Sequence, residues 1–286
     1  MQGKIYISII LLLIFSCSGS EKAPVYQTWN SLKEMEYWSA DNPTPDETPL
    51  QGFFPWAGIT SHHILSHEYL DAYFFHLAQM RDVQRFYILS PDHYGVSLRP
   101  YSFTTGSWDS GFGFVESDRK KVRVLSQLLE VELDPNVFIY EHGISALIPY
   151  IKKYFPKAKV VAAIHGRDSA VNTLISGRLA DVLEKEFDES GKQKNFLLIS
   201  ADFSHGENRE VTYDFDANSR RYLENSGNET WNFVCCDNRS GIYILDRLGK
   251  RSLESSIIYH TNSWEISGQG EDDITSYFFV YFADKL

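Results

Sequence analysis

Three uninterrupted apolar runs of strand length divide the middle of the chain. They are Arg85–Ser90, Lys159–Ile164 and Asn195–Ser200. A strand that faces water on one side alternates apolar and polar residues, whereas a strand covered on both faces is apolar throughout. The three runs therefore predict strands that are buried between two layers of helices.

Helical periodicity is found between and around these runs. Asp168–Phe187 and Glu68–Met80 carry apolar residues at helical spacing, and Gly143–Tyr154 is a further expected helix. Ser117 and Asp118 are typical helix-start residues in front of another amphipathic segment. Helices thus separate the predicted strands along the chain.

Two late segments, Ser255–Tyr259 and Tyr277–Phe282, are rich in residues that favour β-structure. The alternation of strands and helices predicts an α/β fold, with a central, mostly parallel or mixed sheet flanked by helices. In such folds the functional loops follow the carboxyl ends of the strands. We therefore expect the functional residues of this chain in these loops.

The first 17 residues have a different pattern. Lys4 precedes the apolar run Ile5–Phe15, and small residues surround Cys17. This order is typical of an export signal. The run is too short for a helix that spans a bilayer, which needs about 20 residues.

The segment Ile14–Cys17 resembles a bacterial lipobox, in which the signal peptidase cleaves before a cysteine that is then lipidated. We expect residues 1–17 to be a lipoprotein signal peptide with Cys17 lipidated, so that the exported protein is anchored to the cell envelope. The alternative is an ordinary secretory signal in which Cys17 has no role. The composition of residues 18–51 predicts a flexible tether, and residues 52–286 are predicted to form one domain.

The composition of the chain limits the classes of binding partner that we expect. The chain of 286 residues has a formal net charge of −11, and the clustered Lys and Arg that contact a phosphate backbone are absent, so no nucleic-acid partner is expected. A membrane contact is expected through the lipid anchor, and the sequence leaves protein partners open. The three cysteines, Cys17, Cys235 and Cys236, exclude a disulfide framework.

Three predicted strand ends carry histidines. His62 follows an apolar stretch, whereas His93 and His205 follow two of the buried runs and lie close to Asp92 and Asp202. Packing alone rarely places three imidazoles at equivalent strand ends. Because neutral imidazole binds zinc, copper and iron, the pattern predicts a metal site.

Five short segments, in order, resemble the motifs of the Memo family, whose prokaryotic members are called AmmeMemoRadiSam system protein B. They are Ser61-His62, Leu89–Gly95, Glu141–Ile144, Ser200–His205 and Cys236. The match runs from about residue 52 to the C-terminus, so the domain 52–286 is identified as Memo-like. The resemblance implies a fold similar to that of class III extradiol dioxygenases.

The resemblance implies site residues as well. The family's metal ligands fall on His62, His93 and Cys236, while Asp202 and His205 line the same cavity. Two imidazoles and one thiolate leave an open coordination position. Of Asp202 and His205, one would orient a ligand or substrate and the other would shuttle a proton.

His142 and His63 complete the candidates. His142 is expected at the start of a helix, where the helix dipole favours the neutral imidazole, and we class it with Asp202 and His205 as catalytic. His63 is the alternative to His62 as ligand because the residues around them depart from the family pattern. Cys236 could also be only a small buried residue.

The function implied is that of a metal-binding protein with redox or dioxygenase-like chemistry on a small-molecule substrate. Iron is the expected metal, copper the second candidate, and zinc the third, since no His-Glu-x-x-His pattern is present. The alternative is a non-catalytic metal- or ligand-binding lipoprotein that retains the dioxygenase-like fold.

Overall fold

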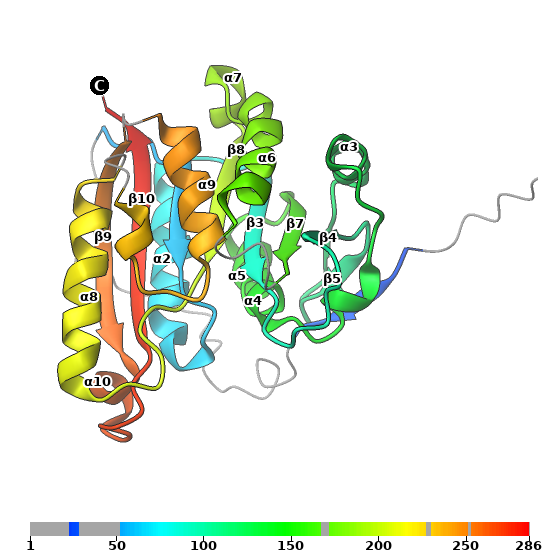
Figure 1. Ribbon diagram of the computed structural model, residues 1–286. Helices are drawn as coiled ribbons and strands as arrows, with labels where there is room; N and C mark the ends of the chain where they lie inside the picture. The colour runs from blue at the N-terminus through cyan, green and yellow to red at the C-terminus, as the bar shows by residue number, and fades with distance from the viewer. Residues whose placement is uncertain (1–22, 29–51, 167–171, 227–229, 251–252, 286) are drawn as a thin grey trace, which may run out of the picture.

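A seven-stranded mixed sheet forms the centre of the protein (Figure 1). This computed structural model describes residues 23–28, 52–166, 172–226, 230–250 and 253–285. The strands, in their order across the sheet, are β4 (Tyr101–Phe103), β7 (Lys159–His165), β3 (Arg85–Pro91), β8 (Asn195–Ser200), β2 (Ala57–Thr60), β10 (Ser276–Asp284) and β9 (Leu253–Asn262).

Parallel pairing is confined to the middle of the sheet. β7, β3, β8 and β2 run parallel, whereas β4 pairs antiparallel with β7, and β10 pairs antiparallel with both β2 and β9. The predicted α/β fold with a mixed sheet is confirmed. β9 and β10 extend well beyond the two β-rich segments expected from sequence, because they pair with each other along nearly their whole length.

Helices cover both faces of the sheet (Figure 1). Those of four or more residues are α2 (His67–Met80), α3 (Arg119–Leu129), η2 (Pro135–Phe138), α4 (His142–Ser145), α5 (Ile148–Tyr154), α6 (Thr173–Leu183), α7 (Glu189–Lys192), α8 (Arg209–Glu224), α9 (Arg239–Gly249) and α10 (Ser263–Ser267). The shorter turns are η1 (Ile64–Ser66), η4 (Glu184–Glu186) and η5 (Trp231–Phe233). Among the described residues, none of these helices combines the length and the apolar character needed to cross a bilayer.

The uninterrupted apolar runs are explained by two separate cores, one on each face. Along β3, Phe86 and Ile88 belong to the core formed with α2 and α5, while Tyr87 and Leu89 belong to the core formed with α6, α8 and α9. Successive side chains of a strand point to opposite faces. A strand covered by helices on both sides must therefore be apolar at every position.

Two predicted helices differ in extent. α6 begins at Thr173, where the side chain of Asn172 accepts hydrogen bonds from the first-turn amides, and residues 168–171 of the prediction lie outside the described residues. The helix expected over Gly143–Tyr154 is two helices, α4 and α5. Pro149 stands in the first turn of α5, where its missing N–H costs no hydrogen bond.

A second, three-stranded sheet packs beside the first. It consists of β1 (Val25–Gln27), β5 (Ser107–Asp109) and β6 (Phe114–Glu116). Tyr26 of β1 is buried against Trp108, with ring centroids 5.4 Å apart. β1 therefore brings part of the segment expected as a tether, 18–51, into contact with the domain. The expected signal peptide, 1–17, lies outside the described residues.

Candidate metal centre

Three histidines converge at the carboxyl edge of the sheet. His62 follows β2, His93 follows β3, and His142 opens α4. One ring nitrogen of each lies within 4.8 Å of those of the other two, which is a spacing that one metal ion can bridge. The ring centroids of His62 and His93 are 4.6 Å apart, and those of His93 and His142 are 4.0 Å apart.

The hydrogen bonds of His62 fix which of its nitrogens carries the proton. Its Nδ1 lies 2.9 Å from Oγ of Ser200, and that hydroxyl donates its single hydrogen to the carbonyl of Gly143 at 2.6 Å. The hydroxyl must therefore accept from Nδ1–H. In the neutral imidazole Nε2 is then unprotonated, as a metal ligand must be.

His93 is oriented by a buried carboxylate. Glu141, which is 1% exposed, accepts from Nδ1 of His93 at 2.5 Å and from the His93 backbone amide at 3.0 Å. The same carboxylate caps α4 by accepting from the amide of Gly143 at 2.8 Å. A carboxylate that holds Nδ1–H directs the other nitrogen toward a metal and raises its basicity.

Two aspartates face the Nε2 atoms. Oδ2 of Asp237 lies 3.4 Å from Nε2 of His62 and 3.3 Å from Nε2 of His93. Oδ2 of Asp202 lies 3.6 Å from Nε2 of His62, while its Oδ1 accepts from the hydroxyl of Ser61 at 2.5 Å. Carboxylate oxygens and imidazole nitrogens thus lie close together. Their combined negative potential favours a bound cation between them.

The charges of these carboxylates decide the protonation of the two facing imidazoles. Burial opposes protonation of His93, but hydrogen bonds and charge from Asp237 and Glu141 outweigh it and raise its pKa to about 10. For His62, burial is likewise outweighed by Asp202 and Asp237, which raise the pKa. Both imidazoles lower the pKa of Asp237, although burial opposes this. The centre therefore attracts a cation, whether a proton or a metal.

His142 behaves in the opposite way. Burial, followed by the positive charges of His93 and His62, lowers its pKa to about 3. The direction agrees with the sequence-based expectation of a neutral imidazole. The physical cause differs, because α4 has four residues and desolvation leads the shift.

Asn238 fastens the segment that carries Asp237 to the sheet. Its amide donates to the carbonyls of Leu89 at 2.9 Å and Ser200 at 2.8 Å, and its oxygen accepts from Nε2 of His165 and from the amide of Gly241. This fully paired side chain caps α9 and joins it to the ends of β3, β7 and β8. Asn238 therefore ties the start of α9, and with it the neighbouring Asp237, to the ends of these three strands.

The other predicted histidines lie outside the cluster. His63 is exposed, stacks on Tyr277 and receives a hydrogen bond from the Leu65 amide, so the structure brings His62 and not its neighbour to the centre. His205 is exposed on the loop after β8. Asp202 is buried at the centre, as described above.

Cys236 is not brought into the group of converging ligand atoms among the described residues. It is partly buried and packs against the apolar core shared by α6, α8 and α9. Burial and the neighbouring charge of Asp237 raise the pKa of its thiol well above the usual range. Metal ligation by Cys236 stays a prediction, and Cys17 lies outside the described residues.

Four further residues of this centre were not predicted from the sequence as site residues: Asp237, Glu141, Ser200 and Asn238. Glu141 and Ser200 stood inside recognised motifs, next to His142 and at the end of an apolar run. Asp237 follows Cys236 directly and precedes a typical helix-capping asparagine. A carboxylate at the start of a helix was the available signal, and it was too common to single out.

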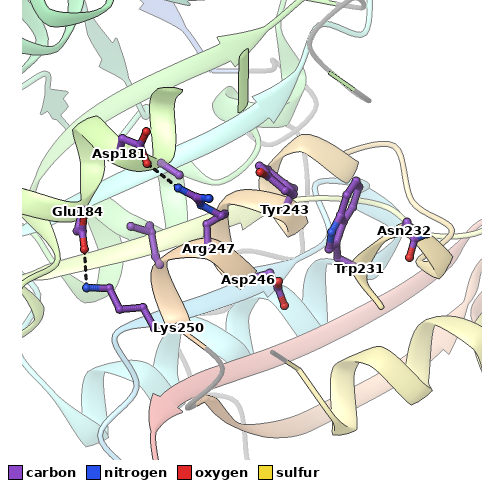
Figure 2. A pocket seen from close by; sticks show the side chains of 10 residues that line it. Asp181, Glu184, Trp231, Asn232, Tyr243, Asp246, Arg247 and Lys250 are labelled. Carbon is purple, nitrogen blue, oxygen red and sulfur yellow. Dashed lines mark hydrogen bonds and ion pairs between the residues drawn. The ribbon is translucent and has the colours of Figure 1, made fainter. Parts of the chain in front are cut away.

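A separate cavity of about 610 Å³ lies between α6, η5 and α9 (Figure 2). Trp231 and Tyr243 meet edge to face there, with centroids 4.9 Å apart, and Arg247 pairs with Asp181 at 2.7 Å. None of the converging histidines lines it. The cavity is therefore distinct from the candidate metal centre.

The fold and the site define an α/β protein with a candidate three-histidine metal centre at the carboxyl edge of its sheet. Residues 27–243 match the family model described as Memo-like protein. The chain therefore belongs to the Memo family, and the assignment made from its sequence motifs is confirmed.

Individual relatives agree with this assignment. The chain is 32% identical over 128 residues to a MEMO1 family protein of Pyrobaculum aerophilum, covering 44% of each chain. It is 26% identical over 189 residues to a MEMO1 family protein of Pyrobaculum arsenaticum, covering 66% of this chain and 64% of that one. The aligned part thus spans less than two thirds of either relative.

A solved structure shares the fold. It is an uncharacterized protein, JW3007, from Escherichia coli K12, with a TM-score of 0.53 and 12% sequence identity. The similarity covers 78% of this chain and 98% of that one. At this identity the likeness concerns the fold alone.

Proposed function

We propose that this Memo-family protein binds iron between His62 and His93, with His142 beside the ion, and uses it in redox chemistry on oxygen or a small organic molecule. The observation that carries the proposal is the direction of two lone pairs. Ser200 and Glu141 hold the Nδ1 hydrogens of His62 and His93, so both Nε2 atoms face the same volume beside two carboxylates. A donor set of this kind fits a divalent cation.

Iron is favoured over copper and zinc by the chemistry of the surroundings. Imidazole suits all three metals, whereas carboxylate oxygen is a harder donor that suits iron better than cuprous ion. Asp202 and Asp237 lie within 3.6 Å of the imidazole nitrogens. Copper remains the second candidate and zinc the third. Bound iron would supply a redox-active Lewis acid at this edge of the sheet.

The residues around the ion have proposed roles of their own. His142 is neutral at physiological pH, because its pKa is near 3, and it can accept a hydrogen bond from a bound molecule. Asp202 holds the His62 backbone through its Oδ1. His205, which is exposed on the loop after β8, is the proposed proton shuttle to solvent.

Metal analysis tests this function. The full chain, prepared without oxygen and loaded with ferrous ion, should hold about one iron atom per chain, and His93→Ala should retain much less under the same conditions. Oxygen uptake with catechols and other small phenols then separates an enzyme from a metal-binding protein without turnover. Wild-type protein that retains no iron would overturn the proposal.

Export and lipid attachment complete the proposal. The arrangement of Lys4, Ile5–Phe15 and Cys17 supports a bacterial lipoprotein signal, and a membrane contact through the lipid. In a bacterial host, radioactive palmitate should label the wild-type chain and leave Cys17→Ser unlabelled. Equal labelling of both chains, or labelling of neither, would contradict lipidation at Cys17.

A further inference from the structure

Asp237 occupies the position of an anionic ligand between the two best-oriented imidazoles. We infer that Asp237, and not Cys236, supplies the negatively charged ligand of the metal centre. This inference rests on the proposed function, since it concerns the ion bound by the same histidines. It gives the centre two imidazoles and one carboxylate as its first three ligands, with His142 as a neighbouring imidazole.

The distances fit one shared ion. Ligand atoms that lie about 2.1 Å from an ion stand about 3.0 Å apart at a right angle and about 3.4 Å apart at the tetrahedral angle. Oδ2 of Asp237 is 3.4 Å from Nε2 of His62 and 3.3 Å from Nε2 of His93. Oδ2 of Asp237 therefore stands at ligand-to-ligand spacing from both imidazole nitrogens.

The donor chemistry points the same way. When both imidazoles are neutral, the Nε2 atoms are unprotonated, since Nδ1–H is engaged by Ser200 in one ring and by Glu141 in the other. Oδ2 of a carboxylate is also an acceptor. Three acceptors at this spacing call for a cation between them, which is a proton in the metal-free centre and which a metal ion can replace.

The other oxygen of Asp237 is already committed. Its Oδ1 accepts from the backbone amide of Asp202 at 3.1 Å, and the amide of Asp237 donates back to the carbonyl of Asp202 at 3.0 Å. These reciprocal bonds fix the carboxylate plane and leave Oδ2 alone to face the imidazoles. Asp237 is therefore oriented as a one-oxygen ligand before any metal arrives.

The neighbouring thiol lies on a different side of the chain. Cys236 packs against the apolar core of α6, α8 and α9, while the next residue faces the histidines. Asn238 fixes this arrangement by bonding the strand-end carbonyls of Leu89 and Ser200. Bringing the thiol to the ion would require this anchored segment to rotate and would remove Asp237 from its two neighbours.

The type of ligand atoms affects which metal ion the centre prefers. Two histidines and one carboxylate, with positions left open, are the ligands typical of non-haem ferrous centres, whereas a thiolate would favour cuprous ion. We therefore expect this chain to prefer ferrous over cuprous ion. The expected preference distinguishes a carboxylate centre from a thiolate centre even where both bind metal.

Two matched variants test the inference in the full-length protein. Asp237→Asn keeps the shape of the side chain and the oxygen that receives the Asp202 amide, but it removes the negative charge. It should weaken ferrous-ion binding at least about 100-fold. Cys236→Ser should bind ferrous ion as wild type does. Equal circular dichroism spectra and melting temperatures would show that both variants are folded.

A spectroscopic measurement on wild-type protein does not depend on any variant folding. Cupric ion added to the centre should give no intense sulfur-to-copper charge-transfer absorption in the visible range, and Asp237→Cys should create that absorption. An intense band in wild type that Cys236→Ser abolishes would overturn the inference and leave the metal function intact. If wild type binds neither iron nor copper, the proposed function itself fails.

Discussion

Among the described residues, an aspartate meets a histidine in two clusters, and the geometry of the two differs. In the metal centre, Nδ1 of His93 is held by Glu141, and Nε2 turns toward Asp237 and a second imidazole. In the other cluster, between α8, β9 and β10, Nε2 of His260 is itself bonded to Asp216 at 2.8 Å.

The second cluster is closed. Oδ1 of Asp216 accepts from the hydroxyl of Ser276 at 2.6 Å, and the ring of His260 stacks on Phe278 with centroids 4.0 Å apart. No second imidazole faces this carboxylate among the described hydrogen-bond and ion-pair partners. A histidine beside a carboxylate is therefore not enough for a site. What distinguishes the candidate metal centre is that imidazole nitrogens of two histidines converge on one carboxylate.

The largest expected effect follows from removing one imidazole of each cluster. His93→Ala removes a ligand and should weaken metal binding by at least about 100-fold, whereas His260→Ala should bind metal as wild type does. Calorimetric titration with ferrous ion under nitrogen measures both. Equal losses in the two variants would show that the two clusters do not differ in the way described.

A smaller effect is expected when the support of an imidazole is weakened. Glu141→Gln replaces the carboxylate that receives Nδ1–H of His93 with a weaker acceptor, and it should reduce metal affinity about 10- to 100-fold. The control is Glu186→Gln, because Glu186 also accepts from a tyrosine hydroxyl and a lysine but lies away from the centre. If both variants lose affinity alike, Glu141 acts only through overall stability.

The pH dependence of metal binding tests the charges assigned to the centre that contains His93. The pKa of His93 is raised to about 10, so the apo centre carries a proton at neutral pH that the metal must displace. Affinity should therefore rise with pH, by about tenfold per pH unit for each proton released. Titrations between pH 6 and 8 in two buffers of different ionisation enthalpy count the protons. Affinity that is constant or falls over this range would contradict the charge balance assigned to the centre.

The smallest expected effect concerns stability alone. His260→Ala leaves the buried carboxylate of Asp216 with one partner fewer and should lower the free energy of unfolding by about 1–3 kcal/mol. Urea denaturation of the apo protein measures this. A variant that is as stable as wild type would mean that the closed cluster contributes nothing to folding.

Much of the fold could be predicted because the strong signals are local. The runs at Arg85–Ser90, Lys159–Ile164 and Asn195–Ser200 correspond to β3, β7 and β8, since a strand covered on both faces must be apolar throughout. The break between α4 and α5 was missed because helical periodicity continues across it. The pairing of β1 with β5 depends on contacts between distant segments, which no local pattern records.

The site was predictable only as far as its motifs reached. His62, His93 and His142 stood in recognised segments, and the structure brings these three together. His205 follows a strand just as His93 does, yet it is exposed, because the direction of a loop depends on its packing. Asp237 and Cys236 are adjacent, and contacts with distant strands, made by Asn238 and by Asp237 itself, hold Asp237 toward the histidines.

The most direct test of the account is the position of iron in crystals of the protein grown or soaked with ferrous ion without oxygen. An anomalous difference map at the iron absorption edge should contain one strong peak, about 2.0–2.3 Å from Nε2 of His62, Nε2 of His93 and Oδ2 of Asp237. A peak bound to the sulfur of Cys236, or a map with no peak between the two imidazoles, would contradict it.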